Sequence, residues 1–236
     1  MSTSHLYRVD KTKGCTILLV RHPESESNNE LHRDPHVSED VLLAHKNPDI
    51  TELGQIQIEK TVDHLVNKCN TDPEARIIAI TSIQSRAKKM AMAYLEKSAN
   101  SNTKEYTVLT DDADLYEYRR PGKGDITIDN HILKEEPWYG FLLRVKLFKD
   151  RLQAIISQNN CKYIIVFGHS IFFSALAHLC TSPKYRLMSV DDLSFHFPNA
   201  SISAFIYNGK MWSMLYHGSV SHLEEHERTG THTHIY

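Results

Sequence analysis

Short apolar runs recur along the chain, separated by longer stretches in which apolar residues return at helical spacing. Each run is continuous over four to six residues, which is typical of strands buried on both faces of a parallel sheet. We therefore predict four strands in this part of the sequence. They cover residues 16–20, 76–81, 106–109 and 163–167.

The stretches between these runs predict helices. The clearest covers residues 138–157, where five apolar residues are spaced by four, three, four and three positions, as on one face of a helix. These residues are Phe141, Val145, Phe148, Leu152 and Ile155. Three more helices are predicted, at residues 51–68, from Ser82 or Ser85 to about 97, and at 170–180. Thr51 is a candidate N-cap of the first of these.

Two further strands, 201–207 and 211–216, are joined at Asn208-Gly209, a dipeptide that favours hairpin turns. The alternation of strands and helices predicts an α/β fold, a three-layer αβα sandwich whose mostly parallel central sheet has an antiparallel edge strand. No internal repeat or low-complexity linker divides the chain. We predict one domain over residues 1–236, with a core from about 15 to 223 and polar tails. The segments 21–50 and 110–137 are predicted to be irregular.

Composition narrows the classes of partner. With 27 Lys and Arg against 29 Asp and Glu, the chain has no excess of positive charge to attract nucleic acid or anionic lipid. No apolar run approaches the ~20 residues of a membrane span, and the polar first 14 residues do not resemble a secretory signal. Four scattered cysteines without a CxxC pair indicate reduced thiols. We therefore expect a cytoplasmic protein without nucleic-acid or membrane partners, and the sequence does not predict its oligomeric state.

Basic side chains follow three of the predicted strands. The first strand ends in Arg21-His22, the second is followed by Arg86, and the fourth by His169-Ser170. An arginine or histidine after a strand is ordinarily a solvated loop residue. In a doubly wound sheet, however, ligands bind beyond the carboxyl ends of the strands, where these side chains would meet. Several of them together favour a shared site.

This set of side chains suits a phosphoryl group. Guanidinium groups bind phosphate oxygens in pairs and stay charged at any working pH. A neutral imidazole can attack phosphorus through one ring nitrogen while the other donates to a carbonyl, and a second imidazole can stabilise the charge on the transferring group. The sequence contains no GxxxxGK[ST] loop and no carboxylate cluster for paired magnesium ions. We therefore predict chemistry without a metal, a nucleotide or another cofactor.

Several motifs carry a resemblance to a known family. The segment Leu18-Leu-Val-Arg-His-Pro-Glu-Ser-Glu-Ser-Asn28 resembles the Arg-His-Gly signature of the histidine phosphatase superfamily, which includes the phosphoglycerate mutase-like proteins. Six further segments resemble that superfamily's motifs in the right order, so that the resemblance covers residues 16 to 223. They are 50–54 (Ile-Thr-Glu-Leu-Gly), 81–91 (with Met90 where threonine is usual), 114–117, 168–170, 198–202 and 221–223.

The resemblance implies a role for each matching residue. His22 would be the nucleophile that becomes phosphohistidine. Glu117 would protonate the leaving oxygen and then activate water, which requires a carboxyl whose pKa is raised. The phosphoryl oxygens would be held by the remaining matching residues, with Ser170 beside them. These are Arg21, Asn28, Arg86 and His169.

Two positions leave alternatives open. Glu24 and Asp114 lie near Glu117 in the motifs and compete with it for the acid role. Pro23 stands where the superfamily has glycine. Proline keeps the backbone carbonyl but removes an N–H group and favours an extended His22, so the substitution need not abolish activity.

The predicted function is hydrolysis of a phosphomonoester through a phosphohistidine intermediate, with a small phosphorylated molecule or a phosphoprotein as the substrate. Two alternatives remain, a phosphomutase of the same superfamily and a non-catalytic phosphate-binding module. Both histidines and both arginines are present, which disfavours the module. The sequence Tyr118-Arg-Arg-Pro121 after Glu117 differs from the mutase pattern.

Other polar features are interpreted conservatively. The His-x-His pair in residues 231–235 is expected to be a frayed end and not a metal site. The basic cluster 119–123 is expected to be a solvated turn, with contact to an anionic substrate as a minority interpretation.

Overall fold

A computed structural model describes residues 14–33, 47–69, 76–99, 106–122, 124–128, 130–182 and 186–230. The His-x-His pair of the sequence analysis lies outside these residues.

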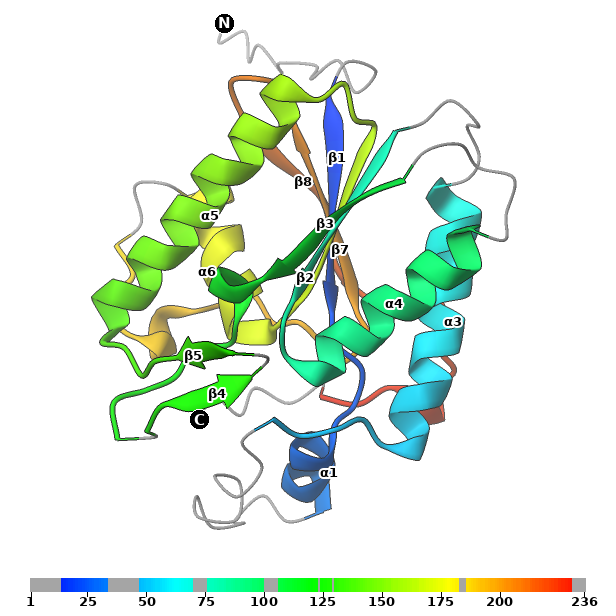
Figure 1. The fold of residues 1–236 in the computed structure, drawn as a ribbon, viewed down its shortest axis with the longest axis vertical. Coiled ribbons are helices and arrows are strands. Elements are labelled where there is room, and N and C mark those ends of the chain that lie inside the picture. The colour runs from blue at the N-terminus through cyan, green and yellow to red at the C-terminus, as the bar shows by residue number, and fades with distance from the viewer. Residues whose placement is uncertain are drawn as a thin grey trace, which may run out of the picture.

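The centre of the molecule is a six-stranded sheet in the order β3-β2-β6-β1-β7-β8 (Figure 1). Strands β3, β2, β6 and β1 are parallel, whereas β7 runs antiparallel to both of its neighbours. The mostly parallel sheet of the sequence prediction is therefore confirmed, and its reversed strand is one position in from the edge. The bounds are β1 Cys15–Arg21, β2 Ile77–Ser82, β3 Tyr106–Asp112, β6 Tyr163–Gly168, β7 Ile202–Tyr207 and β8 Trp212–Ser219.

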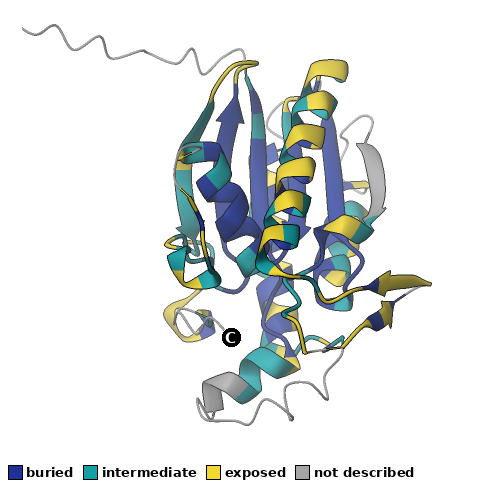
Figure 2. Cartoon of the chain, turned by 90° about the vertical axis from the view of Figure 1, so that its left-hand side faces the viewer, coloured by how far each residue is buried: buried dark blue, intermediate teal, exposed yellow. Residues whose placement is uncertain are grey.

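Helices cover both faces of the sheet, which gives the three layers that the sequence predicts. One face carries α3 (Glu52–Cys69) and α4 (Ser85–Ala99), and the other carries α5 (Trp138–Gln158) and α6 (Ser170–Thr181) (Figure 1). Successive side chains of β1 point to opposite faces of the sheet, as they do in any strand. Ile17 packs with the α5–α6 layer and Leu18 with the α3–α4 layer. Both strand faces are buried, as Figure 2 shows.

The helix α5 follows the apolar stripe found in the sequence. Phe141, Val145, Phe148 and Leu152 are all buried, and all four belong to the core on that side of the sheet. The spacing of these residues therefore predicts both the helix and the face that it buries.

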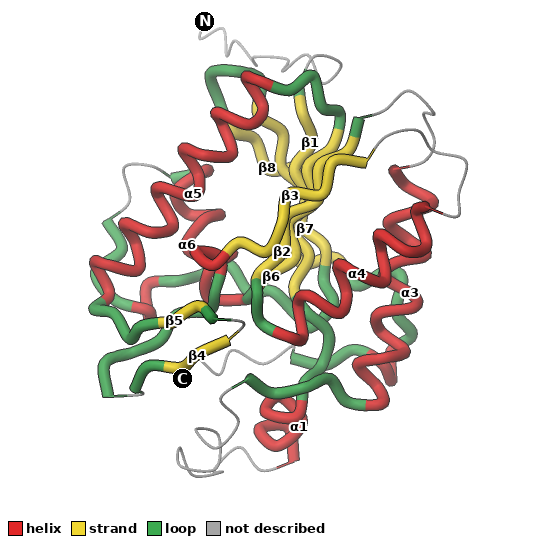
Figure 3. Tube along the Cα trace, viewed as in Figure 1, coloured by secondary structure: helices red, strands yellow, loops and turns green. Residues whose placement is uncertain are grey.

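Two segments that the sequence predicts as irregular contain regular structure (Figure 3). The first contains α1 (Glu26–Arg33), which has no apolar stripe to indicate a helix. The second contains the last residues of β3, the short helix η1 (Ala113–Leu115), and a hairpin of β4 (Ile126–Ile128) and β5 (His131–Leu133). Strands of three residues are too short to show a period in the sequence.

The β4–β5 hairpin packs on its own small apolar cluster, separate from the two main cores. Its buried members are Ile83, Tyr116, Ile126, Ile128 and Leu133. Ile83 precedes α4 and Tyr116 follows η1, so this cluster joins the hairpin to two segments at the carboxyl end of the sheet.

The carboxyl-terminal part of the described chain stays in contact with the body beyond residue 223. The short helix η3 (Glu225–Glu227) lies in this region, whereas η2 (Val190–Asp192) lies earlier in the chain, between α6 and β7. The Gln57 amide of α3 donates hydrogen bonds to the Glu227 carbonyl and to the Thr229 hydroxyl, at 2.7 and 3.1 Å.

The β7–β8 hairpin turns where the sequence predicts it. Gly209 has a φ of +88°, and the Asn208 side chain accepts hydrogen bonds from the backbone N–H groups of Lys210 and Met211. None of the helices in the described part of the chain has the length and apolar content that a membrane span needs.

Candidate active site

The carboxyl end of β1 leads directly into the candidate site. Arg21 is the last residue of the strand, and the backbone of His22 continues the sheet pattern for one more residue. The His22 N–H group donates to the Gly168 carbonyl at 2.9 Å, and the His22 carbonyl accepts from the Ala200 N–H group at 3.0 Å. Hydrogen bonds to β6 and to the segment before β7 therefore fix the backbone of His22 from both sides.

The His22 imidazole is oriented by the residue that follows it. Its Nδ1 lies 2.7 Å from the Pro23 carbonyl oxygen. Because a carbonyl only accepts, this contact assigns the proton to Nδ1 and leaves the lone pair on Nε2. No described residue hydrogen-bonds to Nε2. Pro23 therefore supplies the carbonyl that this orientation needs.

Burial and positive neighbours keep His22 neutral. The side chain is 4% exposed. Burial lowers the His22 pKa well below 6.5, and the nearby Arg86, Arg21 and His169 lower it further. At neutral pH the imidazole is an unprotonated base with a free ring nitrogen.

His169 lies beside His22 at the end of β6, with the ring centroids 5.3 Å apart. The Arg86 guanidinium donates to His169 Nδ1 at 3.3 Å, so the ring proton belongs to Nε2, which donates to the Ser82 hydroxyl at 2.9 Å. Burial, and after it the charge of Arg86, lowers the His169 pKa well below 6.5. Both of its ring nitrogens are thus engaged by protein groups in this structure.

Two buried guanidinium groups complete the positive centre of the site. Arg21 and Arg86 are each 8% exposed, and burial lowers the pKa of each to about 10, which leaves both protonated at neutral pH. Arg21 donates to the Phe197 carbonyl. Among the described residues, however, no group accepts a hydrogen bond from Arg21 Nε or from Arg86 Nη1. Buried unpaired donors of this kind are expected where an anion binds, because leaving them unpaired is costly.

Glu117 follows the short helix η1, and its side chain reaches the amino-terminal end of α6. Its carboxylate accepts hydrogen bonds from the N–H groups of Ile171 and Phe172, both at 3.2 Å. This places negative charge at the positive end of the helix dipole. The carboxylate also raises the pKa of Arg21 and Arg86, against the effect of their burial, so its charge acts on both guanidiniums.

The two competing carboxylates occupy different surroundings. Glu24 is buried, and its Oε1 accepts a hydrogen bond from the Thr51 hydroxyl at 2.8 Å. Asp114 is exposed and forms an ion pair with Arg151 at 3.5 Å. Glu24 thus ties the loop after β1 to the start of α3, and Asp114 lies on the surface.

Asn28 and Ser170 lie at the edge of the same site. The Asn28 side-chain oxygen accepts from the Ser25 hydroxyl and from the Asn199 amide, both at 2.9 Å. Ser170 is the half-buried first residue of α6, and its hydroxyl lies 3.5 Å from the Phe197 carbonyl that Arg21 also contacts.

Comparison with solved structures finds the same architecture in several proteins. Bacillus stearothermophilus YhfR is 16% identical with a TM-score of 0.62, over 89% of this chain and 100% of that one. The phosphoglycerate mutase of Bacillus anthracis is 14% identical with a TM-score of 0.59, over 89% and 95%. The alpha-ribazole phosphatase of Shigella flexneri is 17% identical with a TM-score of 0.58, over 86% and 96%. A scan against protein-family models gives no match, and neither does a search of curated proteins.

The chain has the histidine phosphatase fold. The strand-end motifs that carry the resemblance in the sequence thus lie on the expected scaffold. Arg21, His22, Arg86 and His169 meet at the carboxyl edge of its sheet, as the strand order requires.

Within this histidine phosphatase fold, the structure adds site residues that the sequence analysis did not single out. Asn199 is fully buried, and its amide nitrogen donates to the Pro23 carbonyl at 3.0 Å and to Asn28. Gly230 has a φ of +63°, and a Cβ built on it would lie 2.0 Å from Asn199 Oδ1 and 2.9 Å from Arg21 Nη1. Asn199 lies within the matching segment 198–202, whereas Gly230 carries no signal in the sequence.

Arg144 of α5 holds the loop that carries Glu117. Its Nη1 donates to the carbonyls of Asp114 and Tyr116 at 2.7 and 2.9 Å, and its guanidinium also pairs with the Glu136 carboxylate. The same guanidinium stacks 3.6 Å from the centre of the Tyr116 ring. These contacts fix the backbone on the amino-terminal side of Glu117.

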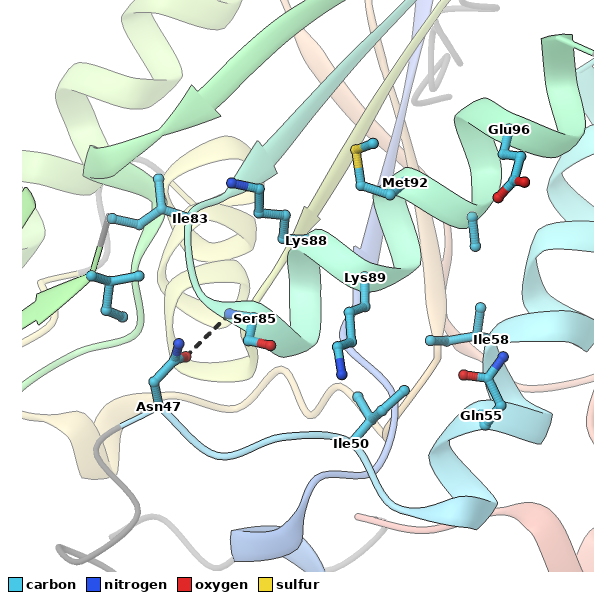
Figure 4. Close-up of a pocket in the computed structure, with 12 residues that line it drawn as sticks. Asn47, Ile50, Gln55, Ile58, Ile83, Ser85, Lys88, Lys89, Met92 and Glu96 are labelled. Carbon is cyan, nitrogen blue, oxygen red and sulfur yellow. Dashed lines mark hydrogen bonds between the residues drawn. The ribbon is translucent and has the colours of Figure 1, made fainter. Parts of the chain in front are cut away.

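A cavity of about 620 Å³ lies along α4 and is lined also by residues of α3 and β4 (Figure 4). Its lining includes Ile83 and Ser85, which flank the turn before Arg86, and the Asn47 side chain accepts from the Ser85 N–H group there at 3.1 Å. Lys89 forms an ion pair with Asp49 at its border. His22, Arg86 and His169 do not line it, so it is separate from the positive centre.

Proposed function

We propose that this protein is a phosphatase that hydrolyses a phosphomonoester through a phosphohistidine on His22, without a metal ion. The observation that carries the proposal is the state of the His22 ring. Its Nδ1 is fixed by the Pro23 carbonyl, its pKa is held well below 6.5, and its Nε2 is free beside two buried guanidiniums. A nucleophile of this kind needs no further activation.

In the proposed first step, the phosphoryl dianion binds to the unpaired donors of Arg21 and Arg86. The lone pair on His22 Nε2 attacks phosphorus as the bond to the leaving oxygen breaks. The two guanidiniums stabilise the negative charge on the transferring oxygens, the work that metal ions do in other phosphoryl-transfer enzymes. Asn28, His169 and Ser170 border the same group of donors.

Glu117 is the proposed acid and base. In the first step its carboxyl carries a proton. That proton goes to the leaving oxygen. The resulting carboxylate then takes a proton from water as the water attacks phosphohistidine, which releases phosphate and restores the neutral His22. Glu117 is favoured over Glu24 and Asp114 because its charge acts on both arginines.

The proposed substrate is a small phosphorylated molecule or a phosphoprotein. The four free, buried cysteines support a reducing compartment, the cytoplasm, as the place of action.

The test uses a panel of phosphomonoesters, assayed for free phosphate with and without EDTA. We expect turnover of at least one ester and no effect of EDTA. After brief exposure to substrate and a quench in base, the protein should carry phosphate that is labile to acid and stable to base. His22→Ala should carry none and should not turn over, whereas His131→Ala, which alters an exposed histidine on β5, should match the wild type.

The same experiment separates the two alternatives. A phosphomutase would return the phosphoryl group to an alcohol and release little free phosphate. A binding module would bind phosphate or vanadate with no turnover of any ester. Activity near the wild-type level in His22→Ala would overturn the nucleophile assignment.

A further inference from the structure

Two cysteines are in contact at the end of the sheet opposite the candidate active site. Cys15 is the first residue of β1, and Cys161 lies in the turn between α5 and β6. Their sulfur atoms are 3.4 Å apart, although 146 positions separate them in the sequence. Both side chains are buried, at 5% and 8% exposure. The fold, and not local sequence, brings these two thiols together.

The backbone around the pair is fixed by the central sheet. Thr16 lies opposite Tyr163 in the parallel pairing of β1 with β6, and the Thr16 N–H group donates to the Lys162 carbonyl at 2.9 Å. A disulfide has a sulfur–sulfur distance of about 2.05 Å, so the two atoms need to approach by about 1.4 Å. Rotation about the Cα–Cβ bond of each cysteine moves its sulfur without a change in the register of the strands.

The two thiols are not equivalent. The hydrogen bond with Cys15 lowers the pKa of Cys161 below its usual value, against the effect of burial, and the charge of Arg76 lowers it further. The same hydrogen bond, with burial, raises the pKa of Cys15. By contrast, burial raises the pKa of Cys69 and Cys180 to about 12. Because the thiolate is the reactive form, Cys161 is the expected nucleophile of the four.

We propose that Cys15 and Cys161 form an oxidation site at which a hydroperoxide makes an intramolecular disulfide. Cys161 attacks one oxygen of hydrogen peroxide, which breaks the O–O bond, gives a sulfenic acid and releases water once the leaving hydroxide is protonated. The Cys15 thiol then attacks the sulfenic sulfur, forms the S–S bond and releases a second water. Two thiols are oxidised and one peroxide is reduced. This proposal does not depend on the proposed phosphatase activity.

Peptide mapping tests the proposal directly. The reduced, full-length protein is exposed to hydrogen peroxide under native conditions, unfolded in an alkylating reagent, and digested with trypsin without reductant. We expect a cross-linked pair of peptides 14–21 and 152–162, two hydrogen atoms lighter than their sum. Peptides 69–76 and 163–184, which contain the other two cysteines, should be recovered in alkylated form. Recovery of Cys15 and Cys161 as separate alkylated or singly oxidised residues would overturn the proposal, as would a cross-link to Cys69 or Cys180.

Variants and thermal unfolding give a second, independent readout. In Cys15→Ser, peroxide should drive Cys161 to the sulfinic acid, because the thiol that resolves the sulfenic acid is gone. The matched control, Cys69→Ser, should form the cross-link as the wild type does. The cross-link should raise the thermal midpoint of the wild type by about 5 °C or more, since it closes a long loop between central strands. An unchanged or lower midpoint in the cross-linked protein would contradict the view that the native geometry accommodates the bond.

Discussion

Replacing Pro23 with glycine separates two effects that this residue can have on the site, one on stability and one on the position of His22. Pro23 is buried, so the substitution removes three ring methylenes from the interior. At about 0.8 kcal/mol for each buried CH₂, their loss costs roughly 2.4 kcal/mol. The freer unfolded chain adds about 0.4–1 kcal/mol. The free energy of unfolding should therefore fall by about 3 kcal/mol.

The rate of turnover should change little in the same variant. The Pro23 carbonyl is held by His22 Nδ1 at 2.7 Å and by the Asn199 amide at 3.0 Å, and neither contact involves the ring. The backbone of His22 is fixed separately by Gly168 and Ala200. We expect kcat for the best phosphomonoester to stay within threefold of the wild-type value.

Urea unfolding and steady-state kinetics measure the two quantities, with assays well below either thermal midpoint. Pro23→Ala is the matched control, because it restores one carbon of the side chain and should recover part of the stability. A rise of tenfold or more in kcat for Pro23→Gly would show that the ring displaces His22 from in-line attack, since a misplacement of about 1 Å can cost ~100-fold in rate. A stability loss under about 1 kcal/mol would refute the argument from burial.

Three further predictions concern the groups around His22. Arg86→Lys should weaken vanadate binding at least tenfold, because the donors of an ammonium share one nitrogen and cannot reproduce the fork in which Nη2 contacts His169 Nδ1 while Nη1 stays available to the anion. Unchanged affinity would count against Arg86 as a phosphate ligand. Gly230→Ala should destabilise the fold and weaken vanadate binding, whereas Gly209→Ala, which also has a positive φ but nothing within 4 Å of a new Cβ, should lose stability only. The pH dependence follows from the lowered pKa values of His22 and His169. Below pH 6.5 the unfolded chain binds protons that the native histidines do not, so the free energy of unfolding should fall with falling pH. In urea titrations at pH 7.5 and 5, the fall should be smaller in His22→Gln, and an equal fall would contradict the assignment of a neutral buried His22.

Local sequence predicts the elements whose burial pattern is complete within one segment. The apolar run of β1 and the apolar stripe of α5 are examples. Each lies within one segment and packs against a neighbouring layer of helices or strands, which every α/β fold contains. The helix α1 was missed because its residues, Glu-Ser-Asn-Asn-Glu-Leu-His-Arg, contain a single apolar side chain. The β4–β5 hairpin was missed because each strand has only three residues.

The same distinction holds at the site. Arg21, His22, Arg86 and His169 were predictable because each follows a strand, and parallel strands bring their ends to one edge. The residues that orient them were not, because their contacts join distant parts of the chain. Asn199 reaches Asn28 across 171 positions, and Gln57 reaches Thr229 across 172. No local pattern records such pairs.

The separate apolar cluster under the β4–β5 hairpin has a consequence for how the molecule opens. Because its five buried residues belong to neither main core, the hairpin can detach while both cores stay intact. Native-state hydrogen exchange through this partial opening needs less free energy than global unfolding, so the hairpin amides exchange ahead of those in the central sheet. Tyr116 belongs to the cluster and directly precedes Glu117. Each opening event therefore uncovers the Tyr116 ring beside the proposed acid and base, while Arg144 still holds the Tyr116 carbonyl.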